Sequence, residues 1–312
     1  MTPPPESLFD RSLPARIGIA ALNLLLPGLG LVRLGAGLEG GLIAAGTLAL
    51  MWLMAVLAFV LPAGSFVMGG LILAWFLLVY LVALLFSVVR TWPKSRRERG
   101  QEWWSRWYAI ILWWLLSAVC SAGSSAVQER AYRGFYVAAE SMRPTFEKNE
   151  KIVADMRWRT SIVGNIVLVR DRDGTIRIYR VAAIGGQTFA MRGGVPIIDG
   201  KAASESQIGE TVVGDAMTGE LAGRLMREHL PGETGSHDVI QLSGYPQDDV
   251  APVRIPADSV YLLGDNRDFA ADSRISPEDN GVGIASVSTI VGRPLHIAWS
   301  KDHSRIGRRA DH

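Results

Sequence analysis

The sequence contains a single cysteine, Cys120, among its 312 residues, so an intrachain disulfide is excluded. Its few histidines and its lone cysteine show none of the paired spacings that ligate a metal. Glycine pairs such as Gly185-Gly186 do not form a phosphate-binding fingerprint, and a net charge of only +2 creates no field that would attract nucleic acid. We therefore predict no metal, no cofactor, no nucleotide and no nucleic-acid partner.

Hydrophobic residues make up 49% of the chain and crowd into its first 125 positions. Segments 41–61 and 66–89 carry no charge and are long enough to cross the hydrocarbon core of a bilayer. A third apolar segment, 107–122, contains Cys120, which we interpret as a packing residue. A buried helical hairpin of a soluble protein is the alternative. We predict a membrane region over 1–125, with transmembrane helices at 41–61, 66–89 and 107–122.

The first apolar run, 17–33, is shorter and is interrupted by Pro27, Gly28 and Gly30. A true membrane span and a secretory signal peptide are both alternatives for such a run. No small-x-small cleavage site follows it cleanly, and further apolar segments do follow. Its length and its helix breakers favour an interfacial or re-entrant hairpin.

Basic residues gather in the stretch 90–106, which has six of them against two glutamates. Loops of this kind remain in the cytoplasm under the positive-inside rule. The next apolar segment, 107–122, would then carry the chain outward, so residues from about 126 onward lie outside the cytoplasm. This predicts a multi-pass membrane protein, with the lipid bilayer as one partner and the C-terminal domain outside the cytoplasm, which in a Gram-negative cell means in the periplasm beyond the inner membrane.

The second half of the chain, 126–312, reads as an all-β domain. Short runs rich in β-branched residues alternate with glycine and aspartate clusters, which is typical of strands and turns. Residues 202–249 differ, being polar and glycine-rich, and we predict an inserted lobe there with one short helix at 220–227. The expected strands are 151–154, 165–169, 175–181, 188–191, 196–198, 254–256, 260–263 and 289–297.

Three polar stretches follow the last apolar segment in a fixed order. The first is Glu140-Ser141-Met142-Arg143-Pro144-Thr145, and the second is Tyr179-Arg180-Val181. The third runs from Gly264-Asp265-Asn266-Arg267-Asp268 to Asp272-Ser273-Arg274. Each stretch by itself is explained by an ordinary turn or strand. Together, behind a membrane anchor, they resemble the bacterial signal peptidase I family of membrane-bound serine endopeptidases.

The resemblance covers roughly residues 135–300 and implies an extracytoplasmic β-domain of the signal peptidase type. It implies exported preproteins with signal peptides as substrates, bound as an extra strand on an exposed sheet edge. An apolar surface of Phe135, Tyr136, Met142 and Phe146 would face the bilayer. The implied site residues are Ser141 as nucleophile, Tyr179 at the position of the lysine base, Arg180, Asp265, Asp272 and Arg274 as supports, and Ala139, Glu140, Met142 and Pro144 against the substrate.

The sequence departs from the family pattern where the chemistry needs a base. The family activates its serine with a lysine that an apolar pocket keeps neutral, and Tyr179 stands in that position. Ala139 and Ala270 likewise replace hydroxyl residues that would assist the oxyanion and the lysine. A tyrosine has a reference pKa near 10, and burial raises it further. Tyr179 is therefore expected to be a poor base.

No other residue is well placed by sequence to be the base. Only five lysines exist, and Lys94 lies on the wrong side of the membrane, whereas the others lie in turns or beyond the last strand. Two functions therefore stay open, a signal peptidase and a catalytically inactive homologue that serves as a membrane-anchored binding or accessory module. An unrelated membrane scaffold is the least favoured reading. The remaining candidate bases are Lys148, Lys151, Lys201, Lys301, His229, His237 and His296.

Overall fold

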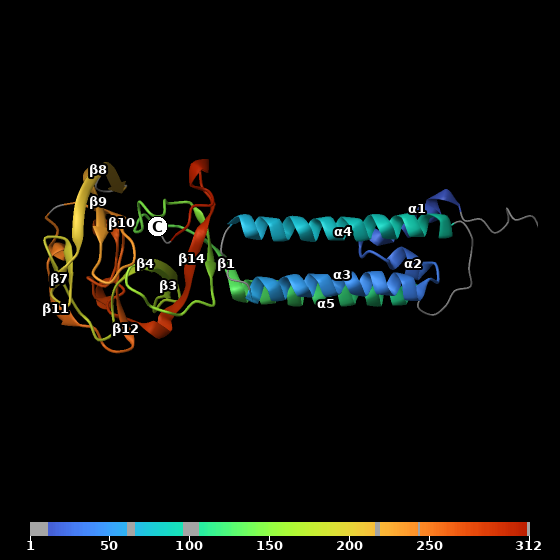
Figure 1. Cartoon of the computed structure of the whole chain (residues 1–312), viewed down its shortest axis with the longest axis horizontal. Helices are drawn as coiled ribbons and strands as arrows, with labels where there is room; N and C mark the ends of the chain where they lie inside the picture. The colour runs from blue at the N-terminus through green and yellow to red at the C-terminus, as the bar shows by residue number, and fades with distance from the viewer. Residues whose placement is uncertain (1–11, 61–65, 96–105, 216–218, 243, 311–312) are drawn as a thin grey trace, which may run out of the picture. The chain divides into compact units, whose positions relative to one another are not determined.

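The computed structural model describes residues 12–60, 66–95, 106–215, 219–242 and 244–310. The chain divides into two compact units, residues 1–131 and 132–312. The first is helical and the second is built from β-strands (Figure 1). The boundary lies beyond residue 125 because the last helix continues through polar residues to Ala131, and the first strand begins at Tyr132.

Long helices cover the three long apolar segments of the first unit. By length and composition, one stretch of the described residues, Leu73–Lys94, is suited to cross a membrane. Spanning by the other helices stays a prediction, and residues 61 and 96–105 of the predicted segments lie outside the described residues. The helices are α1 Leu13–Ala21, α2 Leu29–Arg33, α3 Gly37–Val60, α4 Phe66–Lys94 and α5 Trp107–Ala131, with a 3-10 turn at Leu22–Leu24.

The run 17–33 is folded back on itself at Gly28, whose φ of 101° favours glycine. Buried Asn23 holds this turn, because its Oδ1 accepts hydrogen bonds from the backbone of Gly28 at 3.1 Å and Gly30 at 3.0 Å. The hydroxyl of Ser87 on α4 donates to the same oxygen at 2.5 Å. Neither α1 nor α2 is long enough to span a bilayer, and the position of this hairpin in a membrane stays a prediction.

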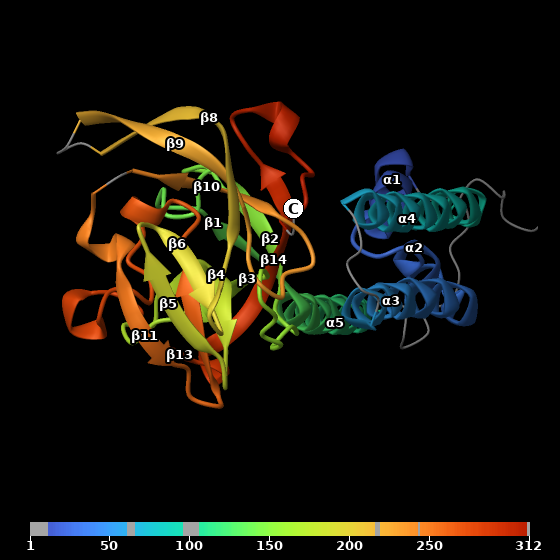
Figure 2. The ribbon, with the colours of Figure 1, turned by 60° about the vertical axis from the view of Figure 1, so that its left-hand side comes forward.

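The described residues of the second unit form three sheets, in which all pairings between named strands are antiparallel. Figure 2 shows the arrangement of these strands. The largest sheet has the order β1-β2-β14-β3-β4-β12-β13, and the others are β10-β9-β8 and β11-β5-β6-β7. The strands are β1 Tyr132–Tyr136, β2 Lys151–Asp155, β3 Ile166–Arg170, β4 Ile176–Ile184, β5 Thr188–Arg192, β6 Val195–Ile198, β7 Lys201–Ala202, β8 Ser204–Asp215, β9 Gly219–His229, β10 His237–Gln241, β11 Val250–Arg254, β12 Ser259–Leu263, β13 Ala285–Ser286 and β14 Ile290–Trp299.

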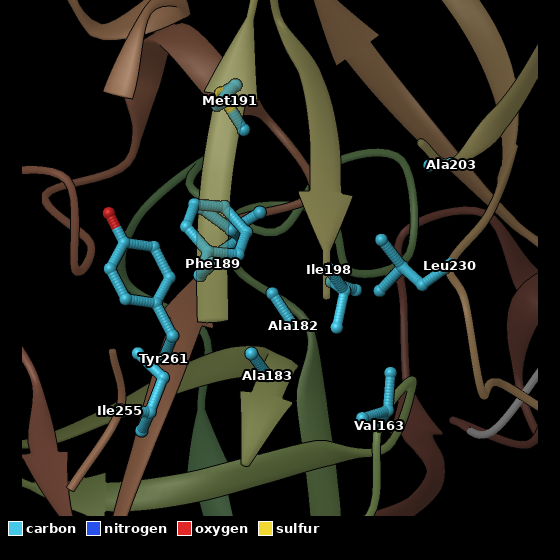
Figure 3. Packing of buried hydrophobic residues seen from close by; sticks show 11 residues of the cluster. Val163, Ala182, Ala183, Phe189, Met191, Ile198, Ala203, Leu230, Ile255 and Tyr261 are labelled. Carbon is cyan, nitrogen blue, oxygen red and sulfur yellow. The ribbon is translucent and has the colours of Figure 1, made fainter. Parts of the chain in front are cut away.

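Strand β4 contributes to the core on both of its faces, because alternate side chains of a strand point to opposite sides. Tyr179 and Val181 pack into one buried cluster, and Ala182 packs into another. In the second cluster the rings of Phe189 and Tyr261 stack with centroids 4.0 Å apart (Figure 3). This double-sided packing fixes the orientation of the side chains at positions 179 and 180.

The predicted lobe at 202–249 contains the three-stranded sheet β8-β9-β10, in which β8 and β9 form a long hairpin (Figure 2). The prediction of a helix at 220–227 is wrong, because these residues belong to strand β9. The segment is rich in good helix formers, but it pairs with β8 on one side and β10 on the other. Pairing on both edges outweighs local propensity. Residues 216–218 and 243 lie outside the described part of the chain.

Candidate active site

Ser141 lies in a series of turns between β1 and β2 that is closed by Val137, whose backbone bonds to Glu150 and Asn149. Met142 and Phe146 anchor these turns, since they are 1% and 0% exposed in a core cluster. The prediction that these two side chains form an apolar surface is therefore wrong. The turns fold back and bury both of them, so Met142 can meet a substrate only through its backbone. Tyr136 does remain exposed, at 56%.

The residues predicted to contact a substrate surround Ser141 with different exposures. Ala139 is exposed, whereas Glu140, Ser141 and Pro144 are partly buried. Within the described residues, the Ser141 hydroxyl has no hydrogen-bond partner in the protein. Its backbone, by contrast, is firmly held.

The loop after β12 holds the backbone of the Ser141 turn. The backbone N–H of Asn266 donates to the Ser141 carbonyl at 3.0 Å, and its side-chain amide donates to the Glu140 carbonyl at 3.0 Å. A Cβ atom at Gly264 would lie 2.7 Å from the Ser141 carbonyl oxygen and 2.2 Å from the Ala270 Cβ. Only glycine permits this approach. Close backbone contact thus positions the Gly264–Asp268 segment against the Ser141 turn.

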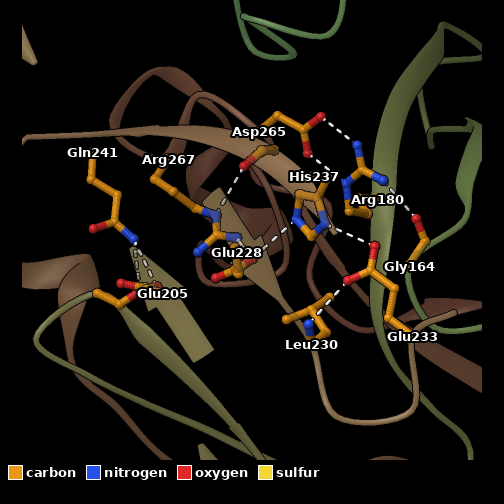
Figure 4. Close-up of polar contacts among 12 residues, drawn as sticks. Gly164, Arg180, Glu205, Glu228, Leu230, Glu233, His237, Gln241, Asp265 and Arg267 are labelled. Carbon is orange, nitrogen blue, oxygen red and sulfur yellow. Dashed lines mark hydrogen bonds and ion pairs between the residues drawn. The ribbon is translucent and has the colours of Figure 1, made fainter. Parts of the chain in front are cut away.

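Arg180 and Asp265 form a buried ion pair beneath this junction (Figure 4). The guanidinium binds the carboxylate in bidentate fashion at 2.8 and 2.7 Å and also donates to the Gly164 carbonyl at 2.6 Å. The Thr145 hydroxyl donates to the same carboxylate. Burial alone would raise the pKa of Asp265, but the charge and hydrogen bonds of Arg180 hold it below its ordinary value. The pair therefore ties β4, the Ser141 turn and the loop after β12 together.

A second buried pair, Asp272 with Arg274, holds the other end of the loop. The two side chains are bidentate at 2.9 Å and are almost completely inaccessible to solvent. Asp272 also accepts a hydrogen bond from the Gly264 backbone at 3.0 Å, and Arg274 donates to the Arg267 carbonyl. All four predicted supporting residues are thus engaged in buried pairs that hold this loop, with Arg180 contributed by β4 and the other three by the loop itself.

Tyr179 lies beside this loop but does not present a free base. Pairing of Arg180 with Leu263 sets the register that places Tyr179 next to Gly264. The side chain is 2% exposed, and its hydroxyl donates to the Ala271 carbonyl at 2.8 Å. Burial raises the pKa of Tyr179 to about 12, so the phenol keeps its proton at neutral pH. The predicted weakness of Tyr179 as a base agrees with this environment.

His296 is half-buried on β14, and burial lowers its pKa. The other alternative bases are exposed or already engaged. Both ring nitrogens of His237 face carboxylates, Glu228 and Glu233. His229 is exposed, with its Nδ1 against the Gly235 carbonyl. The four lysines of the second unit are exposed: Lys148, Lys151, Lys201 and Lys301.

Arg305 is a contact to the Ser141 turn that sequence patterns did not reveal. It follows the last strand and donates to the carbonyls of Pro144 at 3.3 Å and Thr145 at 3.0 Å. It also pairs with buried Glu150 at 2.7 Å. No spacing links residue 305 to residues 144–150, so only the folded chain brings them together.

Comparison with known proteins identifies the family. A family model described as signal peptidase, peptidase S26, matches residues 105–299. This match covers more than half of the chain, and the curled antiparallel β-domain suits that family's fold. The chain belongs to the signal peptidase S26 family, whose members are serine endopeptidases.

Curated relatives agree with this assignment at low identity. Signal peptidase I of Bacillus amyloliquefaciens is 23% identical over 201 residues, which cover 64% of this chain and 91% of the relative. Signal peptidase I V of Bacillus subtilis (strain 168) is 25% identical over 180 residues, covering 56% of this chain and 95% of the relative. A probable signal peptidase I-1 of a Synechocystis species is 24% identical over 165 residues, covering 48% and 67%. Preprotein signal peptides are accordingly the substrate class of this family.

Proposed function

We propose that this chain is a signal peptidase I-like serine endopeptidase that removes signal peptides from exported preproteins at the outer face of a bacterial inner membrane. One observation carries the proposal: the Ser141 carbonyl and the Gly264–Asp268 loop meet in backbone contact above the buried Arg180–Asp265 pair. The family's serine and its supporting loop need this proximity. The proposed substrate-binding residues are Ala139, Glu140, Met142 through its backbone, and Pro144.

The reaction follows from the chemistry of a serine nucleophile. The Ser141 hydroxyl oxygen attacks the scissile carbonyl carbon, its proton passes to a base, and the amine leaves with a proton, giving an acyl-enzyme. Water then hydrolyses the ester and releases the signal peptide. An extended substrate can pair with the free edge of β1, which lies at the end of its sheet and leads directly into the Ser141 turn.

The membrane arrangement is part of the proposal. We propose that α3, α4 and α5 all cross the bilayer, that residues 90–106 face the cytoplasm, and that the hairpin at 17–33 is interfacial. The domain from residue 126 onward then lies in the periplasm. The apolar length of Leu73–Lys94 and the basic residues of the 90–106 stretch support this orientation.

A second function is favoured by one specific observation. Tyr179 occupies the proposed lysine position, its hydroxyl is bound to the Ala271 carbonyl, and burial raises its pKa to about 12. A site that retains its serine and its supports but has no competent base would bind a peptide without cleaving it. The chain would then act as a membrane-anchored binding or accessory module.

Cleavage of a purified preprotein by the detergent-solubilised full chain tests the proposal. We expect one cut, after the signal peptide, with the product identified by mass spectrometry and N-terminal sequencing. A matched preprotein with a large residue immediately before the cleavage site is the control, because the proposed pockets near Ser141 accept small side chains. Binding without any cut would favour the accessory module, and neither binding nor cleavage would refute both functions.

A further inference from the structure

The β8–β10 sheet is attached to the loop that holds Ser141. The backbone N–H of Ile240 donates to the Asp265 carbonyl at 2.8 Å, and Ile240 forms a parallel bridge with Asn266. The Leu242 N–H donates to the Asp268 carboxylate at 2.6 Å. Strand β10 therefore extends its hydrogen bonding into the 265–268 segment, whose Asn266 holds the carbonyls of Glu140 and Ser141.

A row of buried charges reinforces this attachment (Figure 4). Arg267, which is 3% exposed, pairs with the fully buried carboxylate of Glu228 on β9. His237 on β10 is 4% exposed, and its Nε2 lies 3.0 Å from the same carboxylate, an electrostatic contact without a well-aligned hydrogen bond. Its Nδ1 forms a 2.9 Å hydrogen bond with Glu233. The histidine thus lies between two carboxylates inside the protein.

Geometry and charge both favour the protonated imidazole. A neutral ring has one N–H and one lone pair, so one of its nitrogens would face a carboxylate with a lone pair. With His237 protonated, the cations Arg180, Arg267 and His237 balance the carboxylates Glu228, Glu233 and Asp265. With a neutral ring, these groups carry an uncompensated negative charge in a buried place. Glu205 adds a further negative charge when it is ionised. The charged groups around the ring are Glu228, Glu233, Arg180, Asp265 and Arg267, with Glu205 beyond Glu228.

We propose that the protonated His237 is a positioning residue, which holds the Glu228–Arg267 pair and through it keeps the 264–268 loop against the Ser141 turn. This inference rests on the proposed peptidase function for its catalytic consequence, but not for its structural one. Loss of the ring proton weakens the attachment of β10 to the loop. The Ser141 turn then loses its support without any change in the residues that touch a substrate.

The direction of the pH dependence follows from the surroundings of the ring. Burial and the charge of Arg180 lower the pKa of His237, but its contacts with Glu228 and Glu233 outweigh them and raise it above its ordinary value. Because this pKa is higher in the folded state, protonated His237 contributes its full stabilisation of the fold below the pKa of an unfolded histidine, about 6.5. That stabilisation is lost as pH rises through the folded value. The effect therefore appears at a pH above the ordinary histidine pKa of about 6.5.

Glu205 is the other group that can titrate nearby. Burial and the neighbouring Glu228 raise the pKa of Glu205 to about 7, whereas the Arg267 and His237 contacts leave the pKa of Glu228 at about 2 despite its burial. Glu205→Gln removes the Glu205 carboxyl, which titrates in the same pH range, and is therefore a necessary control. A pH effect that survives this substitution does not arise from Glu205.

The test compares the full chain in detergent with the Glu205→Gln control and three further variants. Glu233→Gln keeps the size of the side chain and removes one negative charge from beside the His237 ring. The loss of function that accompanies deprotonation of His237 should therefore occur at lower pH. His237→Gln should abolish that pH step and lower kcat by roughly 10- to 100-fold, as expected for a displaced nucleophile, with little change in KM. His303→Gln, at an exposed histidine, should behave as wild type.

Two readouts do not depend on catalysis. Nitrogen NMR of the His237 ring should show that both nitrogens stay protonated to a higher pH than those of a free histidine. Hydrogen exchange of the 264–268 and 138–143 segments should accelerate above the pH step and in His237→Gln at all pH values. A neutral ring at pH about 6, or unchanged exchange in both segments in His237→Gln, would overturn the inference. Inactivity of wild type at every pH would refute the peptidase function while leaving these two readouts to decide the positioning role.

Discussion

Replacing Tyr179 by lysine should restore a base to a site whose other parts are in place. The residue is 2% exposed and packs among the apolar side chains of β3, β4 and β12. A lysine in such a pocket has its pKa lowered from about 10.4 by up to 3–5 units. Much of it would therefore be neutral near physiological pH. The substitution also removes the hydrogen bond to the Ala271 carbonyl, at a cost of about 1 kcal/mol.

The expected gain in cleavage rate is large, whereas the loss of this hydrogen bond lowers stability only modestly. General-base assistance is typically worth about 10²–10⁴-fold in rate, so even an imperfectly placed amine should raise cleavage measurably. Ala270→Ser would add the hydroxyl that the family places beside its lysine, and it should help only when the lysine is present. This coupling separates a repaired site from a general change in stability.

The assay measures kcat and KM on one preprotein for wild type, Tyr179→Lys, Ala270→Ser and the double variant. Tyr179→Met is the matched control, because it has a flexible side chain of similar length without an amine. Thermal unfolding of each variant shows whether the fold survives. Efficient cleavage by wild type together with slower cleavage by Tyr179→Lys would show that Tyr179 does not stand in the place of a lost base, because the chain would then use a different catalytic partner.

Three further predictions concern topology and the supports of the site. A C-terminal alkaline phosphatase fusion should be active and a fusion near residue 98 inactive; the reverse pattern would place the β-domain in the cytoplasm. Arg180→Ala should cost about 3–5 kcal/mol in urea unfolding because it leaves Asp265 charged and buried. The free energy of unfolding of this variant should also fall less than that of wild type as the pH is lowered. In wild type, the lowered pKa of Asp265 means that its ionised form stabilises the fold above pH about 3.9, and this contribution is lost as the pH falls through the folded value. The same acid dependence in both proteins would contradict this. Gly264→Ala should lower kcat by roughly 10²-fold by displacing the Ser141 backbone, and wild-type kcat would argue against the close contact.

Much of the β-domain could be predicted because its information is local. Runs of β-branched residues between glycine and aspartate turns mark strands such as β3, β5 and β12 directly. The pair Asp272–Arg274 is also local, because only one residue separates the two partners in the sequence. The helix expected at 220–227 was wrong for the opposite reason, since the partners of that segment come from elsewhere in the chain.

The remaining features depend on contacts between distant segments. Sequence spacing could not show that Met142 is buried, because this depends on how the turns fold back onto Ile152 and Ile297. The pairing of Arg305 with Glu150 joins residues 155 positions apart. The charge row from Arg267 to His237 likewise exists only once β9 and β10 pair. Charged residues of these types are common on protein surfaces, so the sequence alone does not show that this row is buried.

Whether Ser141 is the nucleophile can be decided by comparing three proteins. Wild type, Ser141→Ala and Ser206→Ala are incubated with the same preprotein, and the initial rate of signal-peptide release is measured. Ser206 is exposed on β8 and serves as the matched serine control. We expect Ser141→Ala to release no signal peptide while retaining the thermal unfolding midpoint and peptide binding of wild type. Ser206→Ala should cleave as wild type does. Comparable cleavage by Ser141→Ala would contradict the role of Ser141 as nucleophile, because the serine would then be a structural residue of the turn and the chemistry would lie elsewhere.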